Sequence, residues 1–304
     1  MIGLTLKQLR YFEALAQKKH FGQAADACSI SQPALSLQIK ELEAMFGTAL
    51  VERNARQVRL TPVGENLARK ARQILLSVDE LEDLARAANG PLTGRLRLGI
   101  IPTVAPYFLP EVVKTLSQRL PDLDVELREA ITGSLIDELQ AGHLDLAMVA
   151  LPISEPALRE FELFDEEFVL VRPPEDACNP VPPPEILQTM RLLLLEEGHC
   201  FRDQALSFCQ PAKAQPHKLM EGSSLSTLVQ MVGAGMGVTL IPDMAVGLET
   251  RSAEVAISRF PPPRPGRKIG LVWRKTNPLS DQLMEIGAIV RAYCKQSTIK
   301  ANAR

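Results

Sequence analysis

The chain has 304 residues, of which 46% are apolar and 23% are charged. A chain of this length buries a large core and typically forms about two domains. No stretch approaches the ~20 apolar residues of a membrane span and the N-terminus lacks an apolar secretory core, so we expect a cytoplasmic protein without membrane contact. The five cysteines should then be reduced at rest, and a disulfide would be transient and sensory rather than structural.

Charge is distributed unevenly along the chain. Residues 1–72 contain 11 Lys and Arg against 6 Asp and Glu, although the whole chain has a net charge of −2. The rest of the chain is therefore acidic. A basic N-terminal segment on an acidic body predicts nucleic-acid contact that is confined to the N-terminus.

The N-terminal segment has the pattern of a helix-turn-helix. Apolar residues recur at helical spacing over 6–16, a short helix is expected at Phe21–Cys28, and Ser31 can cap a third helix after a tight turn. On that helix Leu35, Ile39 and Leu42 should point inward. The residues left for a DNA groove are Gln32, Pro33, Ser36, Gln38 and Lys40.

Residues 49–61 alternate like a two-stranded hairpin around the Asn54-Ala55 turn. Arg53 and Arg56 suit phosphate and minor-groove contact, so we expect a basic wing that binds DNA. A solvated charged hairpin is the alternative. The position beside a helix-turn-helix favours DNA binding.

A long helix should begin at Pro62 and end at Asn89-Gly90-Pro91. Its apolar residues are spaced by four and three alternately, which predicts a coiled-coil arm that joins two copies of the chain. The alternative is an amphipathic helix that packs on its own domain. The residues of this seam are Leu67, Ala71, Ile74, Val78, Leu81, Ala85 and Ala88.

From Arg95 onward, strand-like and helix-like segments alternate, which predicts an α/β fold with a mostly parallel sheet. Proline-rich breaks at 173–184 and 261–265 interrupt the pattern and suggest two subdomains. We expect a winged helix-turn-helix at 1–61, a linker helix at 62–91 and an α/β domain at 92–304. Its subdomain I would take about 92–165 and 267–304, and its subdomain II about 166–266.

Cys200 and Cys209 lie at the two ends of a helix-like segment. A helix rises ~1.5 Å per residue, so their Cα atoms would be roughly 13 Å apart, whereas a disulfide needs them within about 7 Å. The two thiols can pair only if the segment refolds. Such an arrangement is suited to a redox switch.

Phe21–Glu65 resembles the LysR-type transcriptional regulators across helix-turn-helix, wing and linker start. The α/β remainder resembles that family's periplasmic-binding-protein-like effector domain, so the resemblance covers nearly the full chain. Within the family, the likeness is to the hydrogen-peroxide sensors. The segments that carry it are LLEEGHCFRDQALSFC, IPTVAPYFLP (Ile101–Pro110), LFDE (Leu163–Glu166) and RKIGLVWR (Arg267–Arg274).

The resemblance implies a role for each cysteine of the pair. Cys200 would react with peroxide and Cys209 would resolve it into an intramolecular disulfide. The residues implied in positioning peroxide are Thr103, Thr132, His199, Asp203 and Arg267. The start of a helix and Arg202 would favour a thiolate at Cys200.

The expected function is a DNA-binding activator and repressor of oxidative-stress genes, with hydrogen peroxide as its signal. Its expected partners are double-stranded promoter DNA, RNA polymerase and a second copy of the chain, with a homotetramer as in the family. No cofactor and no enzymatic turnover are expected. A metal ion is not expected either, because the spacing of His199, Cys200, Cys209 and His217 fits no usual zinc site.

Two other functions stay open. One is a LysR-type regulator that responds to a small metabolite bound in the cleft between the subdomains. The other is a thiol peroxidase, which shares the two-cysteine chemistry but does not account for a helix-turn-helix or a heptad arm.

Overall fold

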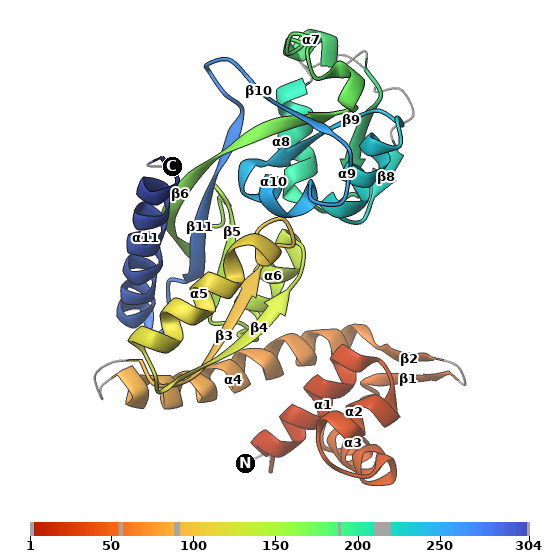
Figure 1. Ribbon diagram of the computed structural model, residues 1–304. Helices are drawn as coiled ribbons and strands as arrows, with labels where there is room; N and C mark the ends of the chain where they lie inside the picture. Colours follow the sequence, from red (N-terminus) through yellow and green to blue (C-terminus); the bar gives the residue numbers. More distant parts are fainter. Residues whose placement is uncertain (1–2, 55–56, 88–91, 188–189, 210–219, 303–304) are drawn as a thin grey trace. The chain divides into compact units, whose positions relative to one another are not determined.

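The computed structural model describes residues 3–54, 57–87, 92–187, 190–209 and 220–302 (Figure 1). The chain divides into two compact units, Met1–Ala85 and Arg86–Arg304. None of the helices in the described residues is long and apolar enough to cross a membrane.

The first unit contains the predicted helix-turn-helix. Ser31 caps the third helix by accepting a hydrogen bond from the Ala34 N–H at 3.3 Å, as predicted. Leu35, Ile39 and Leu42 are buried in one core with Phe12, which confirms the inward face. The elements are α1 (Leu6–Lys18), α2 (Phe21–Ala27), α3 (Gln32–Phe46), β1 (Val51–Asn54), β2 (Gln57–Leu60) and α4 (Pro62–Ala87).

Strands β1 and β2 form the predicted antiparallel hairpin, in which Val51 pairs with Leu60 and Asn54 with Gln57. The turn at 55–56, which includes Arg56, lies outside the described residues, as does the side chain of Arg53.

Helix α4 carries the predicted heptad positions. Ala71 is buried, whereas Ile74 is 44% exposed and Leu81 is 65% exposed. Ala88 lies outside the described residues. Two large apolar side chains therefore stay uncovered along the predicted seam.

The second unit has two hydrophobic cores. The first core is formed by residues between Leu92 and Leu163 and by residues from Ile269 to Cys294, so the chain leaves this subdomain and returns to it. Its elements are β3 (Gly94–Ile100), α5 (Ala105–Arg119), β4 (Leu123–Glu129), α6 (Thr132–Gln140), β5 (Leu146–Leu151), part of β6 (Leu158–Arg172), β11 (Gly266–Arg274) and α11 (Ser280–Asn302).

The second core is formed by residues between Phe168 and Phe260. Its elements are the rest of β6, a short 3-10 turn (Pro174–Asp176), α7 (Pro184–Leu187), β7 (Leu192–Leu195), α8 (Cys200–Cys209), β8 (Met220–Gly222), α9 (Leu225–Gly233), β9 (Val238–Pro242), α10 (Asp243–Glu249) and β10 (Ala256–Arg259). The cores thus divide the effector domain into two α/β subdomains.

The strands of both subdomains belong to one sheet with the order β4-β3-β5-β11-β6-β9-β7-β8, and β10 pairs with β6. The expectation of a mostly parallel sheet is wrong, because every pair that involves β6 or β11 is antiparallel. These two strands carry the chain from one subdomain to the other and back, so they run in opposite directions (Figure 1). The parallel pairs lie at the two outer ends of the sheet.

Candidate functional site

Helix α8 begins at Cys200 and ends at Cys209, so it has the predicted bounds. The residue that allows the chain to turn into it is Gly198, whose φ of +94° is a conformation that other residues rarely adopt. A Cβ atom at this position would also lie 2.9 Å from Ile131 Cδ1. Glycine therefore brings α8 close to the start of α6.

The two cysteines of α8 face different cores. Cys200 is half-buried and packs against the core of the first subdomain, whereas Cys209 is 1% exposed and belongs to the core of the second. Nine helical steps of ~1.5 Å separate their Cα atoms by roughly 13 Å. A bond between them requires α8 to unwind and Cys209 to leave its core.

Burial shifts the pKa of two groups on this segment, and each shift favours the uncharged form. It raises the pKa of the Cys209 thiol to about 11, so this thiol is protonated at neutral pH. It lowers the pKa of His199, against the opposing effect of Glu196, so the imidazole of His199 is neutral at pH 7.

A cavity of about 470 Å³ lies between the subdomains, and Cys200 is part of its wall. Thr132, the first residue of α6, lines the same cavity, so the structure brings these two predicted residues together. Thr132 Oγ1 and Gln204 Oε1 are buried and find no hydrogen-bond partner among the described residues. The wall beside the half-buried thiol therefore holds two polar side chains whose enclosed oxygen atoms could bind a ligand if the side chains turned toward the cavity.

Gln204 was missed by the sequence reasoning. It follows Cys200 by four residues, so both residues lie on one face of α8. This spacing was the available signal. What the sequence could not show is that this face borders a cavity.

Thr103 and Arg267 are also brought together. Arg267 Nη1 donates to Thr103 Oγ1 at 2.7 Å, and Nη2 donates to the Thr103 carbonyl at 3.0 Å. The guanidinium lies over the ring of Phe201, 5.3 Å from its centroid. These contacts link the start of β11 to the residue that follows Cys200.

Glu166 completes this cluster, and it too was missed by the sequence reasoning. Arg267 Nε donates to Glu166 Oε2 at 2.7 Å, and both side chains are at least 96% buried. Burial raises the pKa of Glu166, and the adjacent Arg267 opposes that shift. The other carboxylate oxygen accepts from the Met244 N–H at 3.4 Å, so Glu166 also holds the start of α10.

Arg202 and Asp203 are placed differently from the other predicted residues. Arg202 Nη1 donates to the Leu195 carbonyl at 2.9 Å and to Glu221 Oε1 at 2.6 Å. Asp203 is exposed. Arg202 therefore ties α8 to the ends of β7 and β8.

A buried carboxylate joins the two subdomains on another side. Tyr107 on α5 donates to Glu249 Oε1 at 2.5 Å, and Ser226 on α9 donates to Glu249 Oε2 at 2.5 Å. Together with the Glu166 contact, these bonds fix both ends of α10. The cavity at Cys200 thus lies between subdomains that buried polar groups hold together.

Five of the predicted DNA-facing residues lie on α3 of the first unit. Gln32, Pro33 and Lys40 are exposed, whereas Ser36 and Gln38 are half-buried. Gln38 donates to Glu41 Oε2 at 2.8 Å. The exposed side chains of α3 are therefore free of the core and suited to reach a groove.

The other cysteines are separate from this site. Cys178 is exposed and Cys294 is buried, with a pKa that burial raises to about 11. Cys28 is half-buried, and burial raises its pKa. Among the described residues, no group of three or more His, Cys, Asp or Glu is arranged to hold a metal ion.

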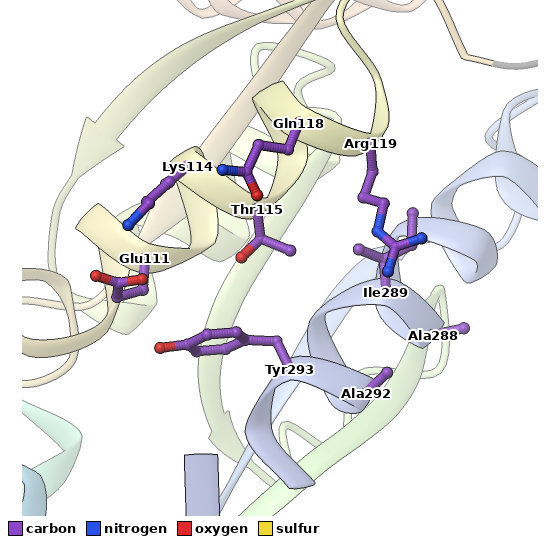
Figure 2. A pocket seen from close by; sticks show the side chains of 9 residues that line it. All are labelled: Glu111, Lys114, Thr115, Gln118, Arg119, Ala288, Ile289, Ala292 and Tyr293. Atoms are coloured by element: carbon purple, nitrogen blue, oxygen red, sulfur yellow. The ribbon is translucent and has the colours of Figure 1, made fainter. Parts of the chain in front are cut away.

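A second cavity, of about 600 Å³, lies between α5 and α11 (Figure 2). None of the predicted redox residues lines it. The side chains in Figure 2 are Glu111, Lys114, Thr115, Gln118, Arg119, Ala288, Ile289, Ala292 and Tyr293. Among the described residues that line this groove, none is a cysteine or a histidine.

Two family models match the chain. Residues 6–65 match the bacterial regulatory helix-turn-helix protein of the lysR family, and residues 89–295 match the LysR substrate binding domain. The chain therefore belongs to the LysR family of transcriptional regulators.

Its relatives within that family include proteins named as peroxide-inducible activators. A probable hydrogen peroxide-inducible genes activator of Streptomyces viridosporus is 45% identical over 291 residues, which cover 94% of this chain and 93% of that protein. A full-length OxyR variant from Pseudomonas aeruginosa has a TM-score of 0.75 and 36% identity, with 95% of each chain covered. A hydrogen-peroxide-bound OxyR mutant from Corynebacterium glutamicum has a TM-score of 0.66 and 35% identity, with 98% and 95% covered.

Proposed function

We propose that this protein is a hydrogen-peroxide-sensing transcriptional regulator whose signal is a reversible Cys200–Cys209 disulfide. The observation that carries the proposal is the placement of the two thiols on α8. Cys200 lines a cavity whose wall includes unsatisfied polar atoms, and Cys209 is buried in the core of the second subdomain. The names of the relatives, which are peroxide-inducible activators and OxyR proteins, support the same signal.

The first step takes place at Cys200. Its thiolate attacks one peroxide oxygen, an S–O bond forms, and the O–O bond breaks. The leaving hydroxide takes up a proton and becomes water, and Cys200 becomes a sulfenic acid. An anion at the first residue of α8 is favoured by the helix dipole.

We assign the peroxide-positioning roles to residues around this cavity. Thr132 lines it, and the Oγ1 atom of this side chain is free to hydrogen-bond to peroxide. Thr103 and Arg267 support Phe201 and the adjacent chain, and the neutral imidazole of His199 can donate or accept a proton. Arg202 and Asp203 remain in the proposal as residues that orient α8.

In the second step, the Cys209 thiol condenses with the sulfenic acid, so an S–S bond forms and water leaves. Helix α8 must unwind, and the buried thiol must move out of the second core. In the loop-entropy model, a disulfide that closes about ten residues constrains the unfolded chain by ~3 kcal/mol. That constraint adds to the free energy of disulfide formation, and the two together must outweigh the packing of α8.

The refolded segment would change the packing between effector domains of one assembly. We propose a homodimer joined through α4, and a tetramer built from it, which holds two α3 helices on a two-fold-related site in promoter DNA. RNA polymerase would be contacted at that promoter, in the cytoplasm, for activation and repression of oxidative-stress genes. The protein would signal once per oxidation instead of turning over peroxide as an enzyme.

Two variants test this assignment. Cys200→Ser should bind DNA but lose its response to peroxide, because it has no sulfur to oxidise. Replacement of Gln32 or Arg53 should weaken DNA binding in both redox states. A Cys200→Ser protein that still responds normally to peroxide would show that the sensing assignment is wrong.

A LysR regulator that responds to a small metabolite is the second candidate. The cavity volume of about 470 Å³ favours it, since pockets for small molecules occupy roughly 300–1,000 Å³. Under this alternative, peroxide treatment would modify only the exposed Cys178 and would leave the DNA footprint unchanged.

A further inference from the structure

We infer that the cavity at Cys200 also admits organic hydroperoxides that have an uncharged apolar group, so this sensor responds to a wider class of oxidants than hydrogen peroxide alone. The inference rests on the proposed function, because it uses the same thiol. It names the substrate class of that site.

The size of the cavity is the first argument. A water molecule occupies ~30 Å³ in the liquid, and hydrogen peroxide has only one more oxygen atom. The cavity measures about 470 Å³. Space for a body of several carbon atoms therefore remains beside a peroxide group that reaches Cys200.

The lining of the cavity matches such a molecule in polarity. Its apolar wall includes Ile136, Leu151 and Ile153. Its polar part includes Thr132 at the start of α6 and Gln204 on α8, whose enclosed Oγ1 and Oε1 atoms have no partner among the described residues and would meet a ligand when the side chains turn toward the cavity. The O–H group of a hydroperoxide can donate a hydrogen bond to Gln204 Oε1, and its oxygen atoms can accept a hydrogen bond from the Thr132 hydroxyl. Its carbon group would lie against the apolar wall.

The charge of the cavity lining further restricts the class of hydroperoxide that we expect to react. Asp137 and Glu155 lie in the lining, and none of the described residues that line the cavity is a Lys or an Arg. Both carboxylates are exposed, so their effect is screened but still disfavours anions. An uncharged alkyl hydroperoxide should therefore react faster than one of similar size that carries a carboxylate.

The reaction is the one proposed for hydrogen peroxide, with a different leaving group. The Cys200 thiolate attacks the terminal oxygen of R–O–O–H, the S–O bond forms, and the O–O bond breaks. The alkoxide leaves, takes up a proton and becomes an alcohol. Cys209 then forms the disulfide and releases water.

Gly133 offers a way to test the cavity without disturbing the thiol. It lies in the lining, and a Cβ atom there would meet no other atom within 4 Å. A Gly133→Leu side chain would therefore occupy open space in the cavity. Gly247 on α10 also has open space around its Cβ position and is outside the cavity lining, so Gly247→Leu is the matched control.

The experiment measures Cys200–Cys209 disulfide formation by rapid quenching into iodoacetamide and peptide mapping. The full chain is treated with hydrogen peroxide, tert-butyl hydroperoxide or a carboxylate-bearing alkyl hydroperoxide. We expect the wild type to react with hydrogen peroxide and with tert-butyl hydroperoxide, and to react more slowly with the carboxylate-bearing hydroperoxide than with tert-butyl hydroperoxide. Gly133→Leu should slow the tert-butyl hydroperoxide reaction about tenfold and change the hydrogen peroxide reaction less than about twofold, while Gly247→Leu changes neither.

Different outcomes overturn different claims. A wild type that forms the disulfide with hydrogen peroxide but not with tert-butyl hydroperoxide would refute the wider substrate class and leave the proposed function intact. An equal slowing of both reactions in Gly133→Leu would also refute it. Failure with every oxidant would refute the proposed function and this inference together.

Discussion

At the scale of single residues, Cys209 is kept protonated by its burial. Its pKa is raised to about 11, whereas a cysteine in an unfolded chain ionises near ~8.5. Above pH 8.5 the folded protein therefore binds more protons at this group than the unfolded chain does. The contribution of this thiol to the free energy of unfolding is therefore fully present below this pH and is lost progressively as the pH rises toward 11.

This difference predicts a measurable pH dependence. Between about pH 8.5 and 11, the wild-type free energy of unfolding should fall by up to ~1.4 kcal/mol per pH unit more than that of Cys209→Ala. Urea titrations of the reduced proteins at pH 7.5 and 10 would measure it. Cys178→Ala, which removes an exposed thiol, should keep the wild-type slope. Equal slopes for the wild type and Cys209→Ala would contradict the burial of this thiol.

Thr132 is a second residue whose environment has a direct consequence. Its Oγ1 atom is buried without a partner in the described part of the chain. Thr132→Val keeps the shape and removes the hydrogen bond to peroxide, which is worth ~0.5–1.5 kcal/mol. The rate of Cys200 oxidation should fall about 2- to 10-fold, with the rate of its alkylation by iodoacetamide unchanged. An equal fall in both rates would place the role of Thr132 in thiol activation instead.

At the scale of elements, the packing of Phe201 helps to hold α8 in its helical form. This ring is 2% exposed, packs edge-on against Phe168 with centroids 4.9 Å apart, and lies under the Arg267 guanidinium. A disulfide between the ends of α8 must displace the residues between them. The packing of Phe201 therefore opposes oxidation.

Phe201→Ala should favour the oxidised form. Loss of a buried phenylalanine costs ~3–5 kcal/mol in the reduced fold, and each 1.4 kcal/mol shifts a two-electron potential by ~30 mV. The Cys200–Cys209 potential should become more negative by ~60 mV or more in a titration against dithiothreitol. Val290→Ala, in the core of the first subdomain, should leave the potential unchanged. An unchanged potential in Phe201→Ala would mean that α8 keeps its packing when oxidised.

The sequence predicted elements where a local pattern decides them. The caps and apolar spacing of α3 and the bounds of α8 follow from neighbouring residues. The direction of the strands was predicted wrongly. Strands β6 and β11 are antiparallel, and this depends on pairs of residues that are distant in sequence, such as Phe161 and Leu271. Thr103 and Arg267 were identified through a family resemblance, whereas Glu166 and Gln204 become visible only when the fold brings α6, α8, α10 and β11 together.

At the scale of the whole molecule, α4 has an apolar stripe that its own unit does not cover. Leu81 is 65% exposed and Ile74 is 44% exposed on this 26-residue helix. Exposed leucine on a heptad is costly in a monomer and is buried in a coiled coil. The proposed signal needs this arm, because a change in an effector domain has to reach both α3 helices of a dimer.

Leu81→Glu should weaken the dimer. Burial of a leucine contributes ~1.5–3 kcal/mol, so the dissociation constant should rise at least about tenfold in sedimentation equilibrium. Val63→Glu introduces the same charge at an exposed valine of the same helix that is not part of the seam, and it should keep the wild-type dimer. Equal dissociation constants for the wild type and Leu81→Glu would place the dimer contact elsewhere.

The central claim is that one disulfide within the chain changes how the protein lies on DNA. The most direct test is peptide mapping of peroxide-treated protein, with the same sample footprinted on its promoter DNA. We expect a Cys200–Cys209 linked peptide together with an altered footprint, and neither in Cys209→Ser. A footprint that changes while both thiols remain free, or a mass shift only at Cys178, would contradict it.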